Sequence, residues 1–98
     1  MTGQVIYTYP LGDFPRPCTQ AMPEDAQVVH VGQQHGVVTV WALVDPDAPK
    51  HEVTLSVVAT GEPFDGYYLG TAQMPNGLVW HVVHGQRRQS AALRGDPK

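Results

Sequence analysis

Residues 26–44 read AQVVHVGQQHGVVTVWALV, and this stretch decides the fold class. Two valine-rich segments, Ala26–Gln33 and Val37–Val44, flank the short connection Gln34-His35-Gly36. Segments rich in β-branched residues that are joined by a short glycine-containing connection are typical of a β-hairpin. The segment Val37–Val44 is apolar at nearly every position, so we expect it to lie in the centre of a sheet or between two layers.

Four further segments extend this pattern on both sides: Val5–Pro10, Glu52–Thr60, Tyr67–Met74 and Leu78–His84. The last two are joined by Pro75-Asn76-Gly77, and Asn-Gly is a strong hairpin signal. Successive side chains of a strand point to opposite faces. The alternation in Glu52–Thr60 therefore predicts a core face of Val53, Leu55, Val57 and Ala59, and a solvent face of Thr54, Ser56 and Thr60.

The composition of the whole chain favours strands over helices. Its 10 Gly and 9 Pro interrupt any long helix. We predict an all-β fold, either a small antiparallel β-sandwich or a partly closed barrel of about six strands. Residues 1–84 form a single β domain in this interpretation, in which Asp13–Asp25, with three prolines, is an ordered loop or edge cover. Residues 85–98 form a flexible basic C-terminal tail.

Acidic and basic residues are unevenly distributed along the chain. Residues 1–84 hold eight acidic and two basic residues, a net charge of −6, whereas residues 85–98 hold four basic residues and one acidic residue, a net charge of +3. An acidic body repels a phosphate backbone, which argues against nucleic-acid binding by residues 1–84. The basic tail suits an acidic protein surface and leaves nucleic acid open as a partner of that segment.

Cysteine content and hydropathy indicate the compartment. The single cysteine, Cys18, excludes an internal disulfide and a cysteine-based zinc site. The first residues lack the basic region and continuous apolar run of a secretion signal. No apolar stretch approaches the ~20 residues that span a bilayer. We therefore expect a cytoplasmic protein without membrane association.

The sequence offers no combination of nucleophile, base and charge-stabilising group for catalysis. We interpret Cys18 as a packing residue. The segment 45–51, DPDAPKH, predicts a rigid turn more than a cation site, because Asp and Pro stabilise tight turns. His81 and His84, three residues apart on a strand, point to opposite faces and do not form a metal pair. We expect no enzyme activity, no cofactor and no metal.

Aromatic residues suit protein binding better. We expect Trp41 and Trp80 in the core. Adjacent tyrosines on a strand cannot both face the core, and an exposed tyrosine is a common interface anchor. The candidate protein-binding residues are Tyr9, Tyr67 and Tyr68, together with the tail residues Arg87, Arg88 and Arg94.

Five motifs of this chain resemble those of a family of short uncharacterised proteins from phages and bacterial genomes. They are VIYTYPL at 5–11, VWALVDPDAP at 40–49, ATGEPF at 59–64, YLGTAQM at 68–74 and LVWHVV at 78–83. The resemblance implies a small β domain in a phage or prophage setting, hence in the host cytoplasm, with no assigned activity and no catalytic residues. The basic tail extends past the usual end of that family.

Two classes of function follow. The first is a non-enzymatic phage-encoded accessory protein that binds a host or phage protein complex, with inhibition of a host defence or metabolic system as its effect. The second is an oligomer that binds a small ligand such as a nucleotide, although Arg16 and Lys50 are the only basic residues of the body. A minor virion component stays open, as does a homodimer.

Overall fold

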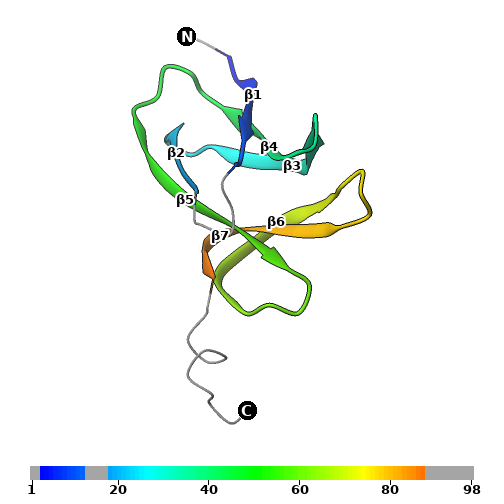
Figure 1. The fold of residues 1–98 in the computed structure, drawn as a ribbon. Coiled ribbons are helices and arrows are strands. Elements are labelled where there is room, and N and C mark those ends of the chain that lie inside the picture. Colours follow the sequence, from blue (N-terminus) through cyan, green and yellow to red (C-terminus); the bar gives the residue numbers. More distant parts are fainter. Residues whose placement is uncertain (1–2, 13–17, 88–98) are drawn as a thin grey trace.

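The computed structural model describes residues 3–12 and 18–87, which form seven strands and no helix. The strands are β1 (Val5–Pro10), β2 (Cys18–Pro23), β3 (Gln27–Gln34), β4 (Val37–Val44), β5 (Lys50–Ala59), β6 (Phe64–Gln73) and β7 (Val79–Arg87). They form a three-stranded sheet in the order β1-β4-β3 and a four-stranded sheet in the order β2-β5-β7-β6 (Figure 1). All strand pairs are antiparallel, and the sheets pack as a sandwich without closing into a barrel, which confirms the predicted fold class.

Both predicted hairpins are present. His35 and Gly36 connect β3 to β4 with φ angles of 55° and 80°, the positive pair that a two-residue type I′ turn requires. The Gln33 side chain accepts a hydrogen bond from the Gly36 N–H at 2.9 Å. In the turn between β6 and β7, the Asn76 side chain accepts a hydrogen bond from the Leu78 N–H at 3.0 Å. Local turn chemistry therefore sets the register of both pairs.

For Asp13–Asp25 the prediction is an ordered loop or edge cover. Residues 13–17 lie outside the described residues, and Cys18–Pro23 is not a loop but the strand β2, which pairs with β5. A proline costs a strand one backbone donor, but a strand at the edge of a sheet has one side without partners and tolerates that loss. β2 is such an edge strand, and it ends at Pro23. A second difference lies at the other end of the domain, where β7 continues beyond His84 to Arg87.

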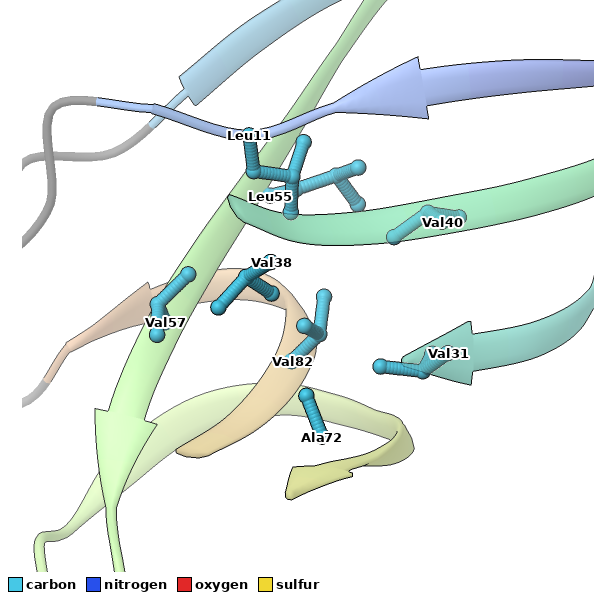
Figure 2. Close-up of a cluster of buried hydrophobic side chains, with 8 residues drawn as sticks. All are labelled: Leu11, Val31, Val38, Val40, Leu55, Val57, Ala72 and Val82. Carbon is cyan, nitrogen blue, oxygen red and sulfur yellow. The ribbon is translucent and has the colours of Figure 1, made fainter. Parts of the chain in front are cut away.

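The core lies between the two sheets (Figure 2). Its larger cluster consists of Leu11, Val31, Val38, Val40, Leu55, Val57, Ala72 and Val82, and a smaller cluster consists of Met22, Ala42 and Val44. The two tryptophans differ from the prediction that both are core residues. Trp80 is half-buried and packs against the larger cluster. Trp41 is half-buried and lies beside His30, with the ring centroids 5.2 Å apart.

β5 is buried on more of its surface than the alternation predicts. Ser56 was expected to face solvent but is fully buried, and its hydroxyl donates a hydrogen bond to the Gly85 carbonyl at 2.6 Å. Val58 and Val83, on the same face of the sheet, are also buried, whereas Thr60 is exposed as predicted. A hydroxyl is compatible with burial once it has a partner, which is why a polar residue in the pattern did not mark a solvent face.

Candidate functional site

Tyr67 and Tyr68 are the most prominent of the predicted site residues. They lie on β6, an edge strand of the four-stranded sheet, with 75% and 58% of their surface exposed. Tyr67 pairs with His84 and Tyr68 with Val83, so their side chains point to opposite faces of the sheet. Both rings thus stand at one edge of the domain, where a partner would reach the sheet from the side.

Tyr9 lies in a different environment. It belongs to β1 in the three-stranded sheet, is half-buried, and packs against both core clusters. Burial, and to a smaller extent the neighbouring Tyr7, raises the pKa of the Tyr9 phenol. The two rings are 6.4 Å apart in an edge-to-face arrangement. Tyr9 therefore contributes to packing and is separated by sheet and by burial from Tyr67 and Tyr68.

The predicted arginines begin at the end of the sandwich. Arg87 is the last residue of β7 and pairs with Phe64 at the start of β6, the strand that carries Tyr67 and Tyr68. Arg88 and Arg94 lie outside the described residues. The basic segment thus starts beside the strand that carries the exposed tyrosines.

Tyr68 is held by a chain of hydrogen bonds that sequence reasoning did not find. Its hydroxyl lies 2.6 Å from the Thr71 hydroxyl, which lies 2.9 Å from His81 Nδ1. On the other side of the imidazole, His81 Nε2 lies 2.7 Å from the Thr60 hydroxyl. Both ring nitrogens of His81 are thereby engaged. The sequence feature from which the Thr71–His81 contact could have been predicted is the Asn76-Gly77 turn, because the register of this hairpin places Thr71 opposite His81.

The other residues considered for metal binding are dispersed. His84 pairs with Leu55 and is exposed, while His81 pairs with Val58, so the two histidines face opposite ways. The segment from Asp45 forms a turn in which the Asp45 carboxylate accepts a hydrogen bond from the Asp47 N–H at 3.0 Å. Within residues 3–12 and 18–87, no three His, Cys, Asp or Glu side chains gather as metal ligands.

A cleft of about 170 Å³ opens at the margin of the core. Leu55 and Met22, both buried, line its floor, and the exposed His51, His84 and Asp25 lie at its mouth. No lysine or arginine is among the described residues that line it. The arrangement offers an apolar surface for a small molecule, with imidazole nitrogens and one carboxylate as polar contacts.

The fold defines a small antiparallel β-sandwich domain. A family model described as a domain of unknown function, DUF7352, matches residues 2–92, and the chain belongs to this family. The match extends beyond His84 into the basic segment, so the family domain is longer than the sequence resemblance implied. No curated protein and no solved structure matches the chain.

In the part of the chain that the structure describes, no helix is long and apolar enough to cross a membrane.

Proposed function

We propose that this protein is a non-enzymatic accessory protein that acts by binding another protein, with Tyr67 and Tyr68 as the anchors of its binding surface. The observation that carries the proposal is their exposure of 75% and 58% at a sheet edge. Burying an aromatic side chain in a partner pocket is among the strongest contributions to protein–protein affinity. The two exposed aromatic rings at this edge are therefore suited to bind a partner protein.

The hydrogen bonds around Tyr68 support this role. The contact of its hydroxyl with Thr71, and that of Thr71 with His81, restrict the ring before any partner arrives. A side chain that is already ordered loses less conformational entropy on binding. Tyr68 is thus ordered before binding. Tyr67 lies on the opposite face of the sheet, so a partner that binds both tyrosines contacts β6 on both faces.

The proposed partner is a host or phage protein in the host cytoplasm, a setting that rests on the resemblance of the VIYTYPL and VWALVDPDAP motifs to phage proteins. Occupying a surface of a defence or metabolic complex needs no catalysis. A standard interface takes about 800 Å² from each partner, which a domain of this size can supply. The basic residues Arg87, Arg88 and Arg94 of the sequence favour a partner with an acidic surface.

The test is a comparison of tagged variants in pull-downs from host cells. Tyr67→Ser and Tyr68→Ser each remove one ring, and Leu78→Ser is the matched control, since Leu78 is 51% exposed on the same sheet's β6–β7 turn. We expect one protein to be captured by the wild type and the control, and to fall by about ten-fold or more with either tyrosine variant. Equal capture by all four folded proteins would contradict the proposal.

A small-ligand binder is the second candidate, and the cleft at His51 and His84 is the observation that favours it. Its volume of about 170 Å³ is below the roughly 300–1,000 Å³ typical of ligand pockets, so it suits a molecule smaller than a nucleotide. Native mass spectrometry of the purified protein checks this candidate. A retained small molecule that is lost in folded Ala26→Trp, which places a large side chain at the half-buried Ala26 of the lining, would support it.

A further inference from the structure

The strand β1 has a free edge without charged side chains. In the three-stranded sheet it pairs only with β4, and its other side has no neighbouring strand in the described chain (Figure 1). None of the residues in Val5–Pro10 is charged. Native proteins normally protect an exposed edge strand with charges, prolines or bulges, because its unpaired backbone groups attract another strand.

The backbone groups on this free edge can be assigned from the pairing register. Leu11 donates its N–H to the Val38 carbonyl, so Leu11 turns its peptide groups toward β4. In an antiparallel pair this orientation alternates from residue to residue. The N–H and C=O groups of Ile6 and Thr8 therefore point away from β4, as does the Pro10 carbonyl, which accepts a hydrogen bond from the Gln20 side chain at 3.4 Å.

The side chains on this edge are also accessible. Ile6 is 60% exposed, Val5 and Tyr7 are exposed to a smaller extent, and Thr8 is exposed. The pairing of β1 with β4 runs without a register shift. The edge strands β3 and β6 each carry a register shift in their own pairing, whereas β2, like β1, is regular and ends in a proline. β1 is thus a regular, uncharged edge.

We infer that β1 is a dimerisation strand, which pairs in antiparallel orientation with β1 of a second copy of this chain. A two-fold axis at Tyr7 sets Ile6 of each copy opposite Thr8 of the other, so the outward N–H and C=O groups of both residues are paired. The two three-stranded sheets then join into one continuous sheet. Pro10 has no N–H and limits the contact to the segment before it.

The second copy is favoured over an unrelated strand because β1 is complementary to itself. Antiparallel pairing of two uncharged strands places no like charges opposite each other, and the two Tyr7 side chains meet as a close aromatic cross-strand pair. A single pair of six-residue strands makes a small interface, so we expect a weak dimer that forms and dissociates reversibly with concentration. This inference uses neither Tyr67 nor Tyr68, so it stands or falls separately from the proposed function.

Sedimentation velocity of the full chain across the micromolar concentration range tests the inference. We expect reversible dimerisation of the wild type. In Ile6→Lys we expect the dissociation constant of the dimer to rise about ten-fold or more, since lysine on an edge strand opposes pairing. Val29→Lys is the matched control, because Val29 is 50% exposed on β3, the opposite edge of the same sheet. It should dimerise like the wild type.

A second variant tests the backbone directly. Thr8→Pro removes an N–H that points away from β4, so the pairing of β1 with β4 is kept while one bond to the second copy is lost. It should also be monomeric, with a melting temperature that shows it is folded. A wild type that stays monomeric throughout the concentration range overturns the inference. So does a dimer that persists in both Ile6→Lys and folded Thr8→Pro.

Discussion

Val31 on β3 lies directly against Gly70 on β6, so that a Cβ atom added at Gly70 would come within 2.7 Å of the Val31 Cβ. The two residues belong to different sheets, and Val31 is part of the buried core. A side chain of any size at position 70 would hold the sheets apart at this point. The absence of a side chain on one strand thus sets the spacing of the sandwich beside the cluster in Figure 2.

Gly70→Ala should lower the free energy of unfolding by about 1–3 kcal/mol, the usual cost of overpacking a core. Urea denaturation measures the loss. The double variant with Val31→Ala removes the Val31 Cγ2 atom, which also lies 2.7 Å from the added Cβ, but keeps the Val31 Cβ. Part of the clash is thus relieved, so we expect the double variant to be more stable than the sum of the two single changes predicts. Strict additivity would show that the close approach carries no energetic weight.

Leu55→Ala should destabilise the protein more than Trp41→Ala does. Leu55 is fully buried in the larger core cluster, and truncating such a residue costs about 2–5 kcal/mol. Trp41, despite its size, is half-buried and belongs to neither cluster. Chemical denaturation of both variants ranks them, and a greater loss for Trp41→Ala would place the stabilising contacts on the outer face of β4.

Thr71 connects Tyr68 to His81, so Thr71→Val should break both hydrogen bonds at once. We expect a loss of about 1 kcal/mol in stability and faster side-chain motion of Tyr68 in NMR relaxation. Thr71→Ser keeps the hydroxyl and is the matched control. If the valine and serine variants give the same Tyr68 dynamics, the hydrogen bonds do not order the ring.

Burial raises the pKa of Tyr9 above its usual value of 10.0. The folded state therefore holds this proton more tightly than the unfolded state does. The resulting stability is present below the usual pKa and is lost as the pH rises through the folded-state pKa. Ultraviolet absorbance titration should show a tyrosine with a pKa above 10.0, and Tyr9→Phe should remove that phase. An unchanged titration curve in the variant would contradict the assignment.

Much of the fold was predictable because the signals are local. β1 and β4 have the predicted bounds, and the two hairpins follow from the turn residues around Gly36 and Gly77. β2 was not predictable in this way. Whether Cys18–Pro23 forms a strand depends on its pairing with β5, far along the chain, and its edge position is what makes Pro23 tolerable.

The candidate site was predictable only in part for the same reason. Two adjacent tyrosines imply that one is exposed, but the exposure of both Tyr67 and Tyr68 depends on the edge position of β6 and on its register shift after Tyr68.

Trp41 was predicted to lie in the core but lies outside it. Every residue of β4 is apolar except Thr39, yet the second sheet packs on one face of it, and Trp41 is on the other.

The order β2-β5-β7-β6 has a consequence for how this protein folds during its synthesis on the ribosome. β7, the last of the described strands in sequence, occupies an inner position and supplies the fully buried Val82 and Val83. Until it emerges, β5 and β6 have no strand between them, and the core lacks Val82 and Val83. The four-stranded sheet therefore forms only after β7 has been synthesised. We expect a product that ends before residue 79 to remain incompletely folded and to be degraded by proteases.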